Sequence, residues 1–175
     1  MRKLYRYVGP PHLAGLAESE SPRFRVASNT GVAEWVAGQP GVESGRSLTV
    51  TFVVLPDALW VADRHSEHVA CARGAPVASA GEITFALDRR RSSVEVDYVT
   101  NQSTGYCPEP ESWPAVAAAL DAAGIARPDG FSVEFVFRRC TKCGSTNVVK
   151  DAWFVCDVCG AVLPREWNYS GGLPE

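Results

Sequence analysis

The residues best suited to chemistry are four cysteines in two C-x-x-C-G units, at residues 140–144 and 156–160. Two thiolates separated by two residues can bind one side of a tetrahedral metal ion. The glycine that follows allows a positive φ that turns backbone amides toward sulfur. Twelve residues lie between the two cysteine pairs, which is the spacing of a hairpin. We therefore predict one zinc ion, bound by Cys140, Cys143, Cys156 and Cys159. Two redox-active pairs or a disulfide pair are the alternatives.

This pattern resembles a zinc ribbon over residues 138 to about 164. A shell of four cysteines leaves no open position for water or substrate, so we expect a structural zinc ion and not a catalytic one. A module this small buries little apolar surface, and the metal supplies the missing folding free energy. The resemblance implies binding of nucleic acid or docking on a protein, because zinc ribbons often do one or the other.

The charge of the chain argues against a protein that grips phosphate backbones over a large face. The sequence has 17 Lys or Arg against 20 Asp or Glu, a formal net charge of −3. Residues 138–175 hold five Arg or Lys and four Asp or Glu, which is not the basic footprint of phosphate binding. We therefore expect a protein partner. Nucleic acid is a less favoured alternative, because arginines scattered in sequence can cluster in space.

A fifth cysteine, Cys107, lies in a loop between a predicted strand and a predicted helix. A thiol near the start of a helix can be exposed and can have a lowered pKa, and both are properties of a nucleophile. A free cysteine is also commonly a small buried apolar residue, so core packing is the alternative for Cys107.

The order of elements around Cys107 resembles a bacterial ubiquitin-conjugating-enzyme-like fold over about residues 28–124. This part of the chain has a predicted helix, four predicted strands, a loop with asparagine ahead of cysteine, and a Trp-Pro-Ala segment at residues 113–115. The resemblance implies that Cys107 is a thioester-forming nucleophile and that Asn101 stabilises the oxyanion. Residues 99–101 read Val-Thr-Asn where that family has His-Pro-Asn.

Two of the three histidines, His65 and His68, lie close together in the sequence and just ahead of Cys71. Either histidine can serve as the general base that activates Cys107. The two histidines and Cys71, with Cys107 as a further ligand, can alternatively form a second metal site. A polar turn with hydrogen-bonded imidazoles is the third interpretation.

These side chains are expected to be positioned by an α+β main domain over residues 1–137, followed by the zinc ribbon and a tail over residues 138–175. Apolar alternation and β-branched residues predict an antiparallel β-meander, and helix-forming segments flank it. The predicted strands span residues 4–8, 48–55, 59–63, 82–87, 93–99 and 131–137, and the predicted helices span residues 32–37 and 112–123, the second ending at Gly124.

The 175-residue sequence has no apolar run of the ~20 residues that span a membrane and no signal-peptide pattern, so we expect a cytoplasmic protein that contacts no membrane. Two classes of function follow. The first is a thiol-dependent acyl transferase acting through Cys107, with a ubiquitin-like protein as the group implied by the resemblance. The second is a non-catalytic zinc-binding adaptor for protein partners.

Overall fold

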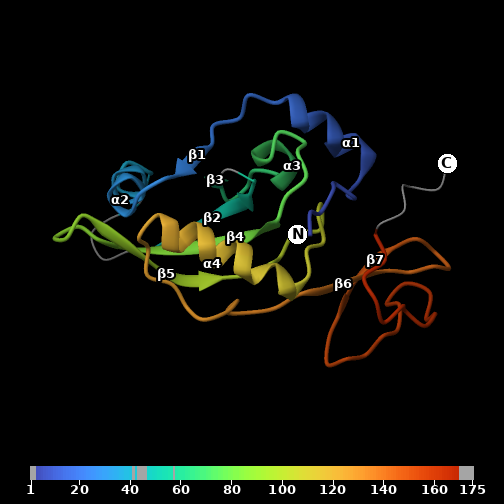
Figure 1. The fold of residues 1–175 in the computed structure, drawn as a ribbon. Coiled ribbons are helices and arrows are strands. Elements are labelled where there is room, and N and C mark those ends of the chain that lie inside the picture. Colours follow the sequence, from blue (N-terminus) through green and yellow to red (C-terminus); the bar gives the residue numbers. More distant parts are fainter. Residues whose placement is uncertain (1–2, 41, 43–46, 57, 170–175) are drawn as a thin grey trace.

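A five-stranded antiparallel sheet forms the centre of the molecule (Figure 1). The structure is a computed structural model that describes residues 3–40, 42, 47–56 and 58–169. In spatial order, the strands are β1 (Phe24–Val26), β3 (Leu59–Asp63), β2 (Ser47–Val54), β4 (Ser79–Asp88) and β5 (Ser93–Val99). The predicted α+β class with an antiparallel sheet is therefore confirmed.

Alternation along the strands gives the sheet two buried faces. Phe52 and Val54 of β2 belong to the larger apolar cluster, whereas Val53 between them belongs to a smaller cluster on the opposite face. Leu59 and Trp60 of β3 divide between the two clusters in the same way. Successive side chains of a strand point to opposite sides of a sheet, so each face needs its own cover.

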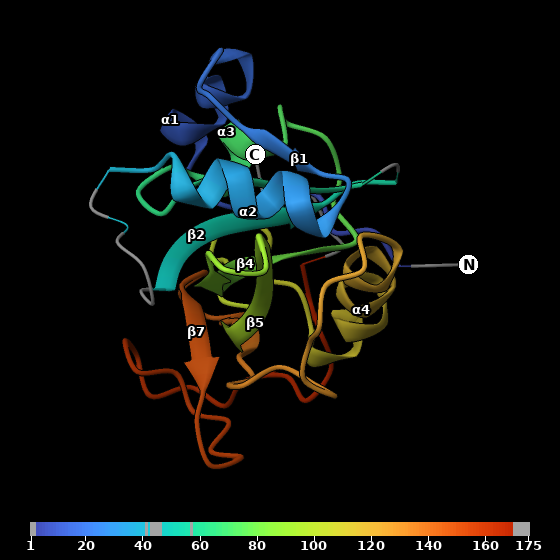
Figure 2. The same ribbon diagram turned by 90° about the vertical axis from the view of Figure 1, so that its left-hand side faces the viewer.

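Helices and loops provide that cover (Figure 2). Both α2 (Asn29–Ala37) and α4 (Trp113–Ala122) contribute buried residues to the larger cluster, and α3 (His68–Cys71) contributes to the smaller one. The chain also forms the short turns α1 (Pro11–Ala14), η1 (Gly15–Glu18) and η2 (Pro110–Ser112). No helix in the described part of the chain is long and apolar enough to cross a membrane.

Local sequence explains where the two longer helices begin and end. The Ser28 hydroxyl accepts a hydrogen bond of 3.2 Å from the Gly31 amide, which caps the first turn of α2. The end of α4 is followed by Gly124 at a φ of +68°, a left-handed conformation that glycine adopts without steric cost. The stop predicted at Gly124 is confirmed.

The order of the strands differs from that of a simple meander. β2 and β3 form the predicted hairpin, but β4 then pairs with β2 and not with β3. The chain between β3 and β4 carries α3, which packs against β2 and β3 on the face of the smaller cluster. The chain therefore crosses the sheet at this point, and the sequential strand order on which the enzyme resemblance depended is absent.

One predicted strand is wrong, another begins later than predicted, and one strand of the sheet was missed. Residues 4–8 form only an isolated bridge between Tyr5 and Val77. In the segment predicted as a strand over residues 131–137, regular structure begins only at Val136. The missed strand is β1, which has only three residues and is too short to show an alternating pattern.

The C-terminal region is a separate two-stranded hairpin, β6 (Val136–Arg139) and β7 (Thr146–Val149), drawn in orange and red in Figure 1. Its strands are antiparallel, and Phe137 lies opposite Val148. The predicted domain boundary after residue 137 falls inside β6. The division of the chain at that point stays a prediction.

Candidate metal centre

Each C-x-x-C-G unit folds into a knuckle with the same backbone hydrogen bonds. In the first, the Gly144 amide donates to the Cys140 carbonyl at 2.9 Å, and the Cys140 amide donates to the Ser145 carbonyl at 2.8 Å. In the second, Gly160 and Cys156 form the equivalent bonds, at 2.9 and 2.8 Å. The two glycines have φ values of +75° and +71°. The left-handed turn expected from the glycine positions is therefore present in both knuckles.

A tight turn brings the second knuckle back to the first. Asp151 and Ala152 both have positive φ, and the Trp153 amide donates to the Lys150 carbonyl at 2.8 Å. Two successive residues with positive φ at the centre of a hairpin turn are the pattern of a type I′ turn, whose twist suits an antiparallel hairpin. The hairpin expected from the spacing of the two cysteine pairs therefore reverses direction at this turn.

Asn147 joins the two knuckles directly, and sequence analysis missed it. Its side-chain amide donates to the Ser145 carbonyl, and its side-chain oxygen accepts from the Asp157 amide, both at 2.9 Å. The residue is 5% exposed, so these bonds are shielded from water. An asparagine between the two cysteine pairs was the only signal in the sequence, and nothing local marked it as a link between segments ten residues apart.

The four predicted ligands converge. Their sulfur atoms all lie within 4.8 Å of one another. The Sγ atoms of Cys140 and Cys159 are 3.5 Å apart, and those of Cys143 and Cys156 are 3.7 Å apart. Sulfur atoms placed tetrahedrally around zinc at about 2.3 Å are separated by about 3.8 Å. The cluster can therefore hold one metal ion, and its position on a C-terminal hairpin is consistent with a zinc ribbon.

The electrostatics of the cluster favour thiolates unequally. Burial opposes ionisation of the Cys156 thiol. Hydrogen bonds from the backbone amides of Cys159 and Val158 and from the side chains of Ser145 and Cys143 outweigh burial and lower the pKa of Cys156 to about 5. The Ser145 hydroxyl and amide lower the pKa of Cys143. The backbone amides therefore stabilise negative sulfur, which is the form that binds a metal.

Cys159 shows the converse effect. The Ala161 amide favours its thiolate, but burial and the other three cysteine sulfurs outweigh that bond and raise the pKa to about 11. Several thiolates this close together repel one another, so ionising the last of them is costly. A bound cation removes that cost, and its binding releases protons.

His65, His68 and Cys71 are not brought together as a second metal site. Within the described residues, the four-cysteine cluster is the only group of three or more His, Cys, Asp or Glu side chains whose ligand atoms converge. The backbone amide of His65 donates to the Asp63 carboxylate at 2.8 Å, and the residue lies in an exposed turn. Cys71 is 2% exposed in the smaller apolar cluster, and burial raises its pKa to about 12.

His68 lies half-buried at the start of α3. Its Nε2 donates to the Gly81 carbonyl at 3.0 Å, and burial lowers its pKa despite that bond. For His68, the structure therefore shows a hydrogen-bonded imidazole, as the third interpretation of the His65–His68 segment expected. A neutral histidine whose Nε2 hydrogen is engaged contributes to packing and to the connection between α3 and β4.

Cys107 is also in the interior. Its side chain is 0% exposed and packs with Phe137 and Tyr169, and its thiol donates to the Thr104 carbonyl at 3.4 Å. Burial raises its pKa to about 12, and the charge of Arg139 opposes that shift only in part. An inaccessible thiol with a raised pKa has the properties of a packed apolar residue. The transferase role of Cys107 stays a prediction that this geometry does not favour.

Asn101, the predicted oxyanion donor, clamps three backbone groups. Its two amide hydrogens go to the carbonyls of Pro108 and Phe135, each at 2.8 Å. Its oxygen accepts from the Phe135 amide at 2.7 Å, and the residue is 0% exposed. Because both donors are engaged, neither is free for an oxyanion in this conformation. The residue instead ties the segment after β5 to the chain that leads into β6.

A second set of polar contacts holds the C-terminal segment that follows the second knuckle. The Trp167 indole donates to the Cys107 carbonyl at 2.7 Å, and its ring lies edge-on to Tyr5 at 5.5 Å. Arg138 is 6% exposed and donates twice to the Arg165 carbonyl, at 3.1 and 2.8 Å. These bonds join residues far apart in sequence, so the sequence alone offered no signal for them.

Comparisons with known proteins gave no family to which this arrangement can be assigned. No protein-family model, no curated protein and no solved structure matched the chain.

Proposed function

We propose that the four-cysteine cluster binds one structural zinc ion. The observation that carries this proposal is the convergence of four sulfur atoms, within 4.8 Å, on two knuckles with matching backbone bonds. A tetrahedral set of four soft thiolates suits Zn²⁺, and a shell of four protein ligands leaves no position for substrate. The ion then holds the ribbon folded and takes no part in catalysis.

We further infer that the protein is a non-catalytic adaptor that docks a protein partner through the ribbon. Among the large hydrophobic side chains of the described residues, the three most exposed are Trp153, Val158 and Val162, at 69%, 72% and 77%. All three lie between residues 153 and 162, on the second half of the ribbon. Exposed tryptophan and valine side chains are suited to burial against another protein.

The competing transferase hypothesis requires an accessible Cys107 thiolate and a free Asn101 amide. The burial of both residues and the engaged hydrogen bonds of Asn101 count against that requirement. Nucleic-acid binding receives no support from charge, because the chain has a formal net charge of −3.

A matched set of surface variants tests the adaptor. The metal-loaded full chain is cross-linked to its neighbours in cells, and captured proteins are compared with those of a variant that carries Trp153→Ser, Val158→Ser and Val162→Thr. We expect this variant to lose a partner that the parent protein captures, while still binding one zinc ion. The control carries three equivalent changes on exposed apolar side chains outside this segment: Leu16→Ser, Tyr98→Ser and Val133→Ser.

The outcome separates the two functions. The adaptor predicts that the control and a Cys107→Ala variant both keep the captured partner. Equal capture by all variants, including the triple ribbon variant, overturns the adaptor. Loss of the partner in Cys107→Ala, together with a thiol-sensitive covalent adduct on the parent protein, would establish the transferase in its place.

A further inference from the structure

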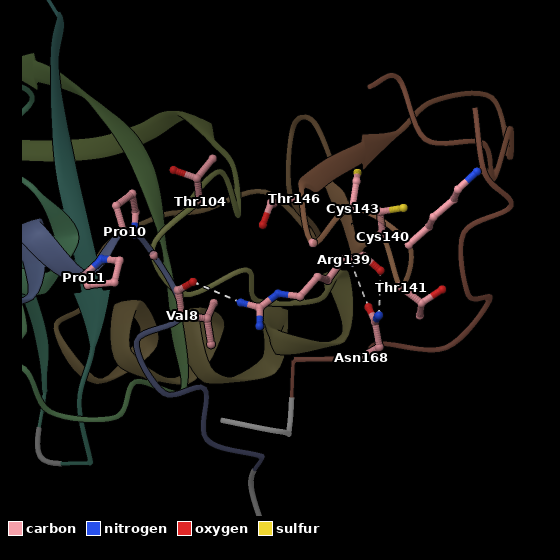
Figure 3. Close-up of a pocket in the computed structure, with 13 residues that line it drawn as sticks. Val8, Pro10, Pro11, Thr104, Arg139, Cys140, Thr141, Cys143, Thr146 and Asn168 are labelled. Carbon is pink, nitrogen blue, oxygen red and sulfur yellow. Dashed lines mark hydrogen bonds between the residues drawn. The ribbon is translucent and has the colours of Figure 1, made fainter. Parts of the chain in front are cut away.

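A cavity of about 980 Å³ separates the first cysteine knuckle from the N-terminal segment at residues 8–11 (Figure 3). One wall is apolar and consists of Val8, Pro10 and Pro11, and the opposite wall is residues 139–144 of the ribbon. Its volume lies in the range of small-molecule sites, which are largely apolar with a few polar groups that orient the ligand. The polar groups of this cavity therefore indicate which ligand it suits.

Arg139 is the most strongly positioned polar group in the cavity. The Asn168 side chain accepts from the Arg139 amide at 2.9 Å and donates to its carbonyl at 2.7 Å. The guanidinium donates to the Val8 carbonyl at 3.2 Å and lies 5.0 Å from the centre of the Tyr169 ring. Backbone and side chain are thus both held before any ligand arrives, which lowers the entropic cost of binding.

The charge of Arg139 has no counterion in the described part of the chain. No Asp or Glu lies within salt-bridge distance of it there, and one of its five N–H groups is engaged, with Val8. None of the residues that line the cavity is acidic, and the exposed Lys142 adds a second positive charge. A half-buried guanidinium with free donors matches the geometry of a carboxylate or a phosphate.

The negative charge of a metal-loaded four-cysteine cluster is the obvious alternative partner for Arg139. Its side chain lies on the side of the cavity toward Val8, and the labelled sulfurs of Cys140 and Cys143 lie on the other side (Figure 3). No hydrogen bond joins the guanidinium to a sulfur atom in the described part of the chain. The side chain is therefore directed into the cavity and not toward the cluster.

We propose that this cavity binds a small organic anion. The carboxylate or phosphate group binds Arg139, and the apolar body of the ligand packs against Val8, Pro10 and Pro11. Three lining threonines, Thr104, Thr141 and Thr146, offer hydroxyl groups for further hydrogen bonds. The cavity borders the metal cluster, because Cys140 and Cys143 line it, but Cys156 and Cys159 do not, and the proposed anion-binding group, Arg139, is not a metal ligand.

The test is a set of NMR titrations of the metal-loaded, nitrogen-15-labelled full chain with four probes. Phenylacetate and phenyl phosphate carry an anion and an apolar ring, phenylacetamide carries the ring alone, and inorganic phosphate carries the charge alone. We expect one or both ring-bearing anions to shift the Arg139, Thr104 and Thr141 amides and to bind at least about tenfold more tightly than phenylacetamide and inorganic phosphate. The comparison of the two anions identifies whether the site takes carboxylates or phosphates.

Three variants locate the binding. Arg139→Gln should weaken the better probe at least about tenfold, and Lys142→Gln, a change to an exposed side chain, should weaken it less. Arg165→Gln is the matched control, because Arg165 also lies on the ribbon and against an aromatic ring, Phe154, but does not line the cavity. It should bind the probe as the parent protein does.

Several results overturn the proposal. One is equal affinity of the protein for the charged and uncharged ring probes. Another is binding of the better probe by Arg139→Gln as tightly as by the parent protein. A third is the absence of any amide shift at millimolar concentrations of the probes. Shifts as large at residues 156–160 as at residues 140–144 would also overturn it, because they would indicate an effect on the metal and not on the cavity.

Discussion

The sheet region and the ribbon bury very different amounts of apolar surface. The larger cluster of the sheet region contains fully buried residues from four strands and two helices, among them Phe52, Ile83 and Phe85. The buried cluster of the ribbon consists of Cys140, Cys156 and Leu163. Two of these three are proposed metal ligands, so the ribbon has almost no core of its own.

This difference indicates that the two regions are stabilised by different physical effects. Burial of apolar side chains supports the sheet at roughly 25 cal/mol per Å². The ribbon depends on thiolate–metal bonds, whose formation is coupled to folding. The few buried polar bonds between the regions, above all those of Asn101 and Trp167, then determine how they are held against each other.

Metal removal should produce the largest effect, and it should be confined to the ribbon. A structural zinc site contributes about 10–16 kcal/mol of apparent binding free energy in small modules. After chelation, or in Cys156→Ser, the NMR signals of residues 140–163 should collapse to the range of an unfolded chain. The signals of β2 and β4 should stay dispersed, and metal analysis of the untreated protein should give one zinc ion per chain.

Two substitutions control this experiment. Cys71→Ala removes a buried cysteine that is not a proposed ligand, and it should leave the zinc stoichiometry at one. Phe85→Ala, in the centre of the sheet, should lower the free energy of unfolding by about 3–5 kcal/mol with the zinc content unchanged. A ribbon that stays folded without metal would contradict the comparison.

Substitution of the Asn101 clamp should have an intermediate effect. Asn101→Ala leaves the Phe135 amide and two carbonyls without their partners, which should cost about 2–3 kcal/mol. Urea unfolding of the metal-loaded protein measures this loss. Gln102→Ala, at the exposed neighbouring position, should change stability by less than about 0.5 kcal/mol. An unchanged stability in Asn101→Ala would contradict the structural role and revive the predicted catalytic one.

A decrease in pH should have the smallest of the three effects on stability. The part of that effect that depends on His68 should destabilise the sheet region. Burial holds the pKa of His68 below its ordinary value, so the unfolded chain binds an extra proton below about pH 6.5. The free energy of unfolding therefore falls as pH decreases through that range, by at most about 1.4 kcal/mol per pH unit. Stability above about pH 7 should not depend on this group.

Comparison of two histidine variants isolates this contribution from any acid release of the metal. His68→Gln should unfold with a weaker dependence on pH than the parent protein between pH 7 and 5. The exposed His65→Gln should follow the parent curve. Identical curves for His68→Gln and the parent protein would show that the His68 imidazole is not buried in the neutral form.

Local spacing in the sequence was enough to predict the knuckles and most of the sheet strands. Each pair of ligands lies within four residues, and the backbone bonds that shape a knuckle form between residues at most five apart. The density of β-branched residues along 48–55 and the polar–apolar alternation along 82–87 likewise predicted strands that the structure confirms as parts of β2 and β4. Local patterns of this kind are contained in a short stretch of chain, so a single sequence reveals them.

The strand order, the burial of Cys107 and the hydrogen bonds of Asn101 were decided only by the tertiary structure. Asn101 bonds to Phe135, which lies 34 residues away, and Trp167 bonds to the Cys107 carbonyl across 60 residues. The local sequence around a cysteine does not show whether its thiol is exposed or buried, because exposure depends on which distant segments pack over the residue. The sequence by itself therefore determined where a metal can bind, whereas long-range packing determined that the most reactive-looking thiol is enclosed.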